Sequence, residues 1–162
     1  MKSYFDVEIK HIVNELLAIF DFNVFDIFYL GEVEKNKMSF SSCFYFRKNE
    51  QGELKDSYSL VKENNITEQD YEEHIDRINS ALVGLFDAFV EDGQSPWDAV
   101  EVFYHNGKVT GKLKYGWFDN DYTPIERRII WAYESLGLMP EVNSYSARLL
   151  NKYIENKGSA NQ

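Results

Sequence analysis

The chain has 162 residues, enough for one domain built around a single hydrophobic core. Hydrophobic residues make up 44% and charged residues 27%, which excludes a wholly disordered, collagenous or coiled-coil protein. With 17 basic and 27 acidic residues the formal net charge is −10, which argues against an unaided nucleic-acid or membrane-surface binder and leaves a basic partner open. An aromatic content of 16% predicts a sheet-rich fold or an aromatic binding face.

The first third of the chain predicts a helix followed by three strands. Apolar residues recur every three or four positions over residues 5–20, the period of one helix face. Residues 24–33 and 38–47 are dense in aromatic and β-branched residues and flank a polar connection, so they predict a hairpin. A third strand is expected at residues 54–61.

The clearest helix pattern covers residues 65–90. Thr67 and Asp70 form a capping-box pattern at its start. One face is apolar, so the opposite face is left to acidic side chains. The apolar stripe consists of Tyr71, Ile75, Ile78, Leu82, Leu85, Phe86 and Phe89.

A second hairpin is predicted around Asn106 and Gly107. Asn-Gly is the strongest short hairpin pattern, because both residues tolerate positive φ. The flanking strands are expected at residues 99–104 and 108–117. Polar and apolar residues alternate along the return strand, which predicts one solvent-exposed face of lysines and threonine and one buried face. The expected buried residues are Val109, Gly111, Leu113, Tyr115 and Trp117.

Two helices are predicted to complete the chain. Thr123 and Glu126 form another capping box with Pro124 at the first helical position, and Gly137 supplies the stop. A last amphipathic stretch covers residues 144–154.

These elements predict an α+β fold. Their order is α-β-β-β-α-β-β-α-α, and strands joined by hairpins form an antiparallel sheet, here of about five strands, with helices packed on it. We expect one domain over residues 1–156 and a flexible tail at 157–162.

Catalytic patterns are scarce, so no catalytic residue is predicted and the protein is not expected to be an enzyme. The three histidines, at positions 11, 74 and 105, lack metal-ligand spacing, and we expect neither a metal nor a cofactor. Cys43 is the single cysteine, which excludes an internal disulfide; its position in a predicted strand favours a structural role. No signal peptide and no run of about 18 apolar residues is present, so a soluble cytoplasmic protein is expected.

A resemblance emerges from the second half of the chain. Gly93 to Trp97 carries G-x-x-P-W, and Pro124 to Pro140 carries P-x-E-R-x-x-x-W-x-Y-x-x-L-G-x-x-P. Together with Phe28 to Val33 (FYLGEV), these motifs resemble the YezG-like immunity protein family, which includes the EsaG-type antitoxins of exported nuclease toxins. The similarity covers about residues 5–142.

The resemblance implies an antitoxin made in the cytoplasm. It would bind a polymorphic nuclease toxin exported by a type VII secretion pathway and so protect the producing cell. A nuclease carries a basic, phosphate-binding cleft, which an acidic inhibitor can occupy, so steric and electrostatic blockade is the expected mechanism. The expected partner is this cognate toxin with a basic surface, without direct nucleic-acid or membrane binding; the free protein is expected as a monomer or homodimer.

Charge density suggests where the toxin binds. Between Glu63 and Asp98 there are ten acidic residues and one basic residue, Arg77. A loop further on combines acids with an aromatic side chain, which suits a protein interface. The alternative is a solvated helix face and an ordinary cap loop. The candidates are Glu68, Glu72, Glu73, Asp76, Asp87, Glu91, Asp92, Asp119, Asp121 and Tyr122.

Two other functions stay open on the sequence. An adaptor or chaperone could keep an exported partner soluble and competent for export. A small hydrolase would need two carboxylates in one cleft with separated pKa values.

Overall fold

The computed structural model describes residues 2–34 and 39–160. The chain forms two compact units, residues 1–117 and 118–162, which are described in turn. Residue 38, the predicted first residue of the second strand, lies outside the described residues.

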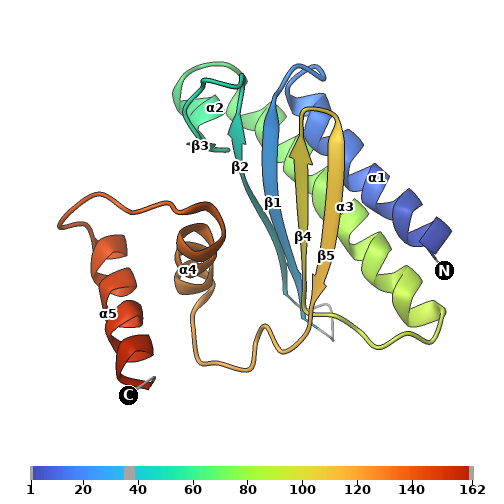
Figure 1. Ribbon diagram of the computed structural model, residues 1–162. Helices are drawn as coiled ribbons and strands as arrows, with labels where there is room; N and C mark the ends of the chain where they lie inside the picture. Colours follow the sequence, from blue (N-terminus) through green and yellow to red (C-terminus); the bar gives the residue numbers. More distant parts are fainter. Residues whose placement is uncertain (1, 35–38, 161–162) are drawn as a thin grey trace. The chain divides into compact units, whose positions relative to one another are not determined.

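The first unit is built on one five-stranded antiparallel sheet with the order β3-β2-β1-β4-β5 (Figure 1). β1 is central and pairs along its length with β2 and β4. The register sets Asp26 of β1 directly opposite Arg47 on one side and His105 on the other. The strands are β1 (Asp26–Val33), β2 (Phe40–Arg47), β3 (Lys55–Asp56), β4 (Ala99–His105) and β5 (Lys108–Lys114).

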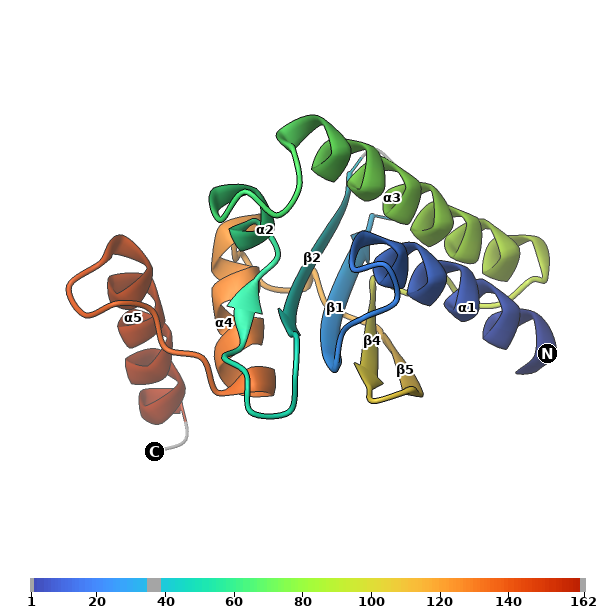
Figure 2. The same cartoon turned by 90° about the horizontal axis from the view of Figure 1, so that it is seen from above.

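Two long helices, α1 (Lys2–Ile19) and α3 (Glu68–Glu91), lie side by side against one face of this sheet (Figure 2). Their apolar stripes and the inward side chains of the strands make the core. The close approach of α3 to β1 depends on Gly31, where a Cβ atom would lie 2.6 Å from Leu82 Cδ1. Fully buried core residues include Ile12, Leu16, Ile27, Tyr29, Phe44, Phe46, Ile78, Leu82 and Trp97.

The local patterns at the start of α3 and at the second hairpin form as predicted. Thr67 Oγ1 accepts a hydrogen bond from the backbone N–H of Asp70 at 3.1 Å. Asn106 and Gly107 connect β4 to β5 with φ values of 45° and 92°. The α+β class and the order of elements are confirmed.

The third strand is much shorter than the predicted 54–61. β3 has two residues, because the Asp56 carboxylate accepts the backbone N–H of Tyr58 at 2.8 Å and turns the chain out of the sheet. A four-residue helix, α2 (Ser59–Lys62), follows and buries Leu60 to 2% exposure. The short helix α2, anchored by the buried Leu60, thus takes the place of the second half of the expected strand.

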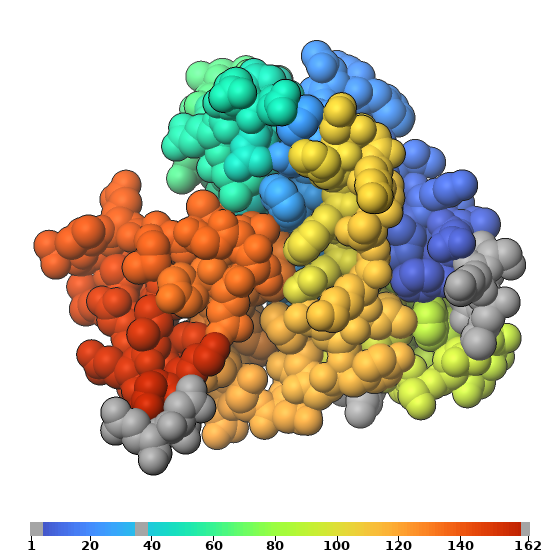
Figure 3. Space-filling model, viewed as in Figure 1, coloured from blue at the N-terminus to red at the C-terminus, as the bar shows by residue number. Residues whose placement is uncertain are grey.

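The predicted buried face of the return strand is wrong over most of its length. β5 ends at Lys114, so Tyr115 and Trp117 lie beyond it; Val109 is 39% and Tyr115 58% exposed. Among the predicted buried residues of β5, Leu113 packs against the core. The reason is position: β5 is an edge strand, and the β4–β5 hairpin lies at the surface (yellow in Figure 3).

The second unit contains α4 (Pro124–Leu136) and α5 (Tyr145–Ala160), which contact each other. The capping box holds, since Thr123 Oγ1 accepts the backbone N–H of Glu126 at 3.2 Å. Gly137 ends α4 in the left-handed conformation, with φ of 68°. α5 continues beyond the predicted end at residue 154.

Candidate functional site

Seven of the ten predicted toxin-binding residues lie on α3 or at its C-terminal end. Because a helix repeats every 3.6 residues, residues 68, 72, 73, 76, 87 and 91 fall on one side of α3, and Asp92 follows as its C-terminal cap. We call this side the acidic face. Asp87 is half-buried and the other six are exposed.

Three neighbouring carboxylates of the acidic face are exposed. Within residues 2–34 and 39–160, Glu72, Glu73 and Asp76 form no ion pair. The one basic residue of this stretch, Arg77, is turned toward α1, where its Nε lies 3.3 Å from Glu15 Oε2. The face therefore presents negative charge on a helix held against the sheet.

At its margin Glu68 accepts a hydrogen bond from the Tyr58 hydroxyl at 3.2 Å. This bond and the negative charge of Glu68 raise the pKa of Tyr58, with smaller contributions from burial and from Glu72. Glu68 is thus engaged by a neighbouring side chain at the edge of the acidic face.

A groove of about 540 Å³ runs along α3 within the acidic face. Phe40 at the start of β2 forms one side and is 46% exposed. Val83 and Gly84 contribute its apolar lining, and Asp76 and Asp87 flank it. An exposed aromatic ring next to two carboxylates suits a ligand that is both basic and partly apolar.

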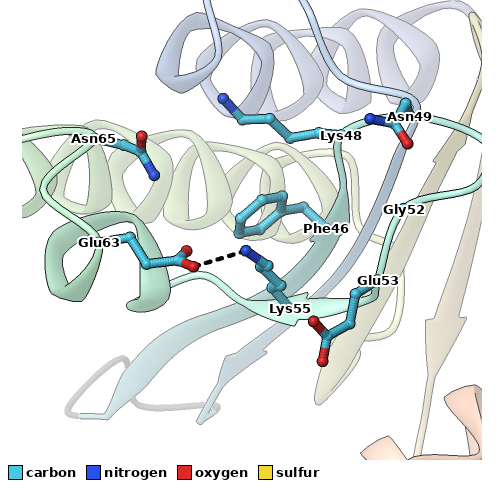
Figure 4. A pocket seen from close by; sticks show the side chains of 8 residues that line it. All are labelled: Phe46, Lys48, Asn49, Gly52, Glu53, Lys55, Glu63 and Asn65. Atoms are coloured by element: carbon cyan, nitrogen blue, oxygen red, sulfur yellow. Dashed lines mark hydrogen bonds and ion pairs between the residues drawn. The ribbon is translucent and has the colours of Figure 1, made fainter.

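A second pocket, of about 390 Å³, lies where β2 turns toward β3 (Figure 4). Phe46 lies among side chains of both charges, and Lys55 Nζ donates to Glu63 Oε1 at 2.8 Å. This hydrogen bond raises the pKa of Lys55. Of the two carboxylates that line the pocket, Glu53 and Glu63, the second is therefore already engaged by Lys55. The remaining lining residues are Lys48, Asn49, Gly52 and Asn65.

Sequence reasoning missed a cluster of polar side chains at one end of the sheet. Asp26 is 1% exposed, and its carboxylate accepts from Arg47 Nη1 at 2.6 Å and from His105 Nδ1 at 2.5 Å. Arg47 Nε also donates to the Gly52 carbonyl at 2.9 Å. The three side chains come from adjacent strands, and only the strand register brings them together.

A second buried carboxylate near the other end of β1 was missed as well. Glu32 is 3% exposed and accepts from Trp117 Nε1 at 2.7 Å and from Ser41 Oγ at 3.2 Å. The backbone N–H of Trp117 donates to the Asp98 carboxylate at 2.8 Å. These bonds fasten the end of the first unit to its sheet, so Glu32 and Asp98 have a structural role.

The described part of the chain holds no group of three or more His, Cys, Asp and Glu residues arranged to bind a metal ion. No helix within residues 2–34 and 39–160 is long and apolar enough to span a membrane. The family model described as "Immunity protein YezG-like" matches residues 8–150. The chain belongs to the YezG-like immunity protein family. No curated protein matches it.

Membership gives this YezG-like protein an immunity, or antitoxin, role and implies a toxin as its binding partner. Such a role is non-enzymatic. It calls for an exposed surface that a second protein can cover, and the acidic face has this property.

The other predicted site residues of this YezG-like protein lie in the second unit. Asp119 and Asp121 are exposed, whereas Tyr122 is half-buried. Its ring meets that of Tyr153 edge-on at 5.9 Å, and its carbonyl accepts from Arg127 Nη1 at 2.8 Å. Tyr122 therefore helps to hold α4 and α5 together, and the two aspartates are the accessible part of the loop.

Proposed function

We propose that this YezG-like protein binds a secreted polymorphic nuclease toxin and silences it by covering the toxin's basic cleft with the acidic face of α3. The observation that carries the proposal is the set of exposed carboxylates, Glu72, Glu73 and Asp76, that have no ion-pair partner within the described residues. A nuclease binds phosphates and so needs a basic cleft. Opposite charge and steric cover together would keep nucleic acid out.

The geometry of the acidic face favours fast and tight association. α3 is a 24-residue helix whose opposite side is buried in the core through Ile78, Leu82, Leu85 and Phe86. A helix held in this way has little backbone entropy to lose on binding. Uncompensated surface charge also steers an oppositely charged partner and can bring association rates to about 10⁸–10⁹ M⁻¹s⁻¹ at low salt.

The loop of the second unit provides a further contact in this proposal. Asp119 and Asp121 are exposed and add negative charge in the same loop as Tyr122, whose half-buried ring packs against Tyr153. Acidic and aromatic side chains together suit a protein interface.

The proposed place of action is the cytoplasm of the producing cell. A toxin destined for a type VII secretion pathway has to be silenced where it is synthesised. The support for this pathway is the resemblance to EsaG-type antitoxins carried by the Gly93–Trp97 and Pro124–Pro140 motifs.

The direct test is co-purification from the native host with a tag at the N-terminus of the full chain. Bound proteins are identified by mass, and nuclease activity is measured in the complex and after the partner has been released by denaturation and refolded. We expect a basic partner that is inactive in the complex and active after release. A partner that cuts nucleic acid equally well while bound would contradict blockade and favour the adaptor function.

A further inference from the structure

Gly84 lies in the interior of α3, where the fold gives no reason for a glycine. A Cβ atom there would meet, among the described residues, only the Glu8 side chain, with Oε2 at 3.7 Å, an ordinary van der Waals distance. This differs from Gly31, where the corresponding atom would lie 2.6 Å from Leu82. Glycine in a helix interior is less stable than alanine. The free protein therefore carries a destabilising residue that its own packing does not require.

Gly84 is also part of the groove along the acidic face. The groove has Phe40 at its side and Val83 beside the glycine, with Asp76 and Asp87 as its charged residues. A missing side chain on a helix permits a partner to approach the helix closely. The unforced glycine thus coincides with the position where an exposed ring and two carboxylates meet.

We propose that Gly84 marks the point of closest approach of the toxin, and that the groove receives an arginine side chain from the toxin's basic surface. The inference rests on the proposed function for the nature of the partner. An arginine combines an apolar stem, which suits Val83 and Phe40, with a guanidinium group that can bond carboxylates in a forked geometry and stack on an aromatic face. Asp76, which forms no ion pair with a described residue, supplies the opposite charge, and Asp87 is a further lining residue of the groove.

Charge argues against a second copy of this chain as the occupant. The formal net charge is −10, and ten of the eleven acidic and basic residues between Glu63 and Asp98 are acidic. Pairing two such faces would set like charges against each other at short distance. A basic partner removes this conflict.

The test compares Gly84→Ala and Gly84→Leu with the wild type and with Gly158→Ala. Gly158 lies in α5, and a Cβ atom added there would meet no described atom within 4 Å, so it is a matched helix-glycine control. Tagged full-length proteins are purified from the native host, and each is titrated with the partner that the wild type retains. Thermal unfolding is recorded for each free protein, and its mass in solution is measured.

We expect Gly84→Ala to raise the melting temperature by about 1–4 °C and to lower the affinity for the partner roughly tenfold. Gly84→Leu should lower this affinity roughly a hundredfold, because the larger side chain fills the groove. Gly158→Ala should leave affinity unchanged. A gain in stability together with a loss of affinity identifies Gly84 as a binding residue, since misfolding would lower both.

The outcomes separate this inference from the proposed function. If both Gly84 variants bind the partner within twofold of the wild type and silence its nuclease activity, the groove is excluded while the antitoxin function stands. If the variants lose a partner that is not a nuclease, or whose nuclease stays active in the wild-type complex, Gly84 is supported and the blockade is contradicted. A wild type that retains no partner, or a Gly84-dependent self-association, overturns the inference.

Discussion

Carboxylates have opposite surroundings in two regions of the first unit. At the two ends of β1, Asp26 and Glu32 are 1% and 3% exposed and accept hydrogen bonds from neighbouring side chains, which belong to Arg47, His105, Ser41 and Trp117. On α3, by contrast, Glu72, Glu73 and Asp76 of the acidic face are exposed and lack ion pairs with described residues.

The difference separates the carboxylates that stabilise the fold from those that are available to bind a partner. A buried carboxylate without hydrogen bonds is costly, so Asp26 and Glu32 are held by donors from neighbouring segments. An exposed carboxylate keeps its hydration and is free to meet a basic surface. Substitutions in the two regions should therefore separate stability from binding.

The largest expected effect is on binding. The triple variant Glu72→Lys, Glu73→Lys and Asp76→Lys should weaken the toxin complex by about 100-fold, equal to about 2.7 kcal/mol, because attraction becomes repulsion at three positions. Its thermal unfolding should match the wild type, since all three side chains are exposed. Calorimetric titration measures the affinity.

A matched control reverses three exposed acids elsewhere, Glu50, Glu141 and Glu155. Both triple variants lose three negative and gain three positive charges, so the formal net charge moves from −10 to −4 in each. Equal weakening by both variants would mean that net charge alone acts, and the acidic face would lose its special status.

Removal of Asp26 should act on stability instead. Asp26→Ala takes the carboxylate from between Arg47 and His105 and should lower the free energy of unfolding by about 2–3 kcal/mol. Chemical denaturation measures this loss. The folded variant should bind toxin normally, and Asp6→Ala, which removes an exposed acid, should change neither property.

A smaller loss is expected at the other end of β1. Trp117→Phe keeps an aromatic ring but removes the N–H that donates to Glu32, which should cost about 1–2 kcal/mol of stability. The same measurement on Tyr115→Phe provides the control, because Tyr115 is 58% exposed. Equal stability of Trp117→Phe and the wild type would show that water replaces the indole donor.

The buried tyrosine of the core, Tyr29, should make the protein less stable as the pH rises above 10. Burial raises the pKa of Tyr29 above its ordinary value of 10.0, partly offset by its hydrogen bond with Ser42. Above pH 10 the unfolded chain loses a proton that the folded chain keeps, so stability falls by about 1.4 kcal/mol per pH unit from this group.

Tyr29→Phe should remove the contribution of Tyr29 to the fall of the unfolding free energy with pH. The contributions of Tyr58, Tyr71 and Tyr153, whose pKa values are also raised, should stay. Denaturation curves between pH 9 and 11 measure the slope. An identical slope in the variant would show that Tyr29 ionises without unfolding the protein.

Local patterns predicted much of the fold. The caps at Thr67 and Thr123, the Asn106-Gly107 turn and the stop at Gly137 depend on the backbone within a few residues, and all four form. The errors came where distant parts of the chain decide. Leu60 is buried in the core from α2 instead of continuing β3, and β5 is an edge strand with Val109 exposed.

The acidic face was predictable in part. Helical periodicity is enough to set residues such as Glu72 and Asp76 on the side of α3 opposite its apolar stripe. Periodicity does not show that Phe40, from a strand, forms the side of a groove with Asp76, nor that Gly84 has room for a methyl group. Both depend on how α3 packs on the sheet.

By itself the sequence determined the α+β class, the order of elements, the acidic stretch and the membership of the YezG-like family, because these follow from local pattern and composition. The tertiary structure alone decided which carboxylates are buried and paired. Asp26 meets Arg47 across 21 positions of the chain and His105 across 79, and Glu32 meets Trp117 across 85. Contacts over such separations arise from strand register, and register is set by the packing of the whole sheet against its helices.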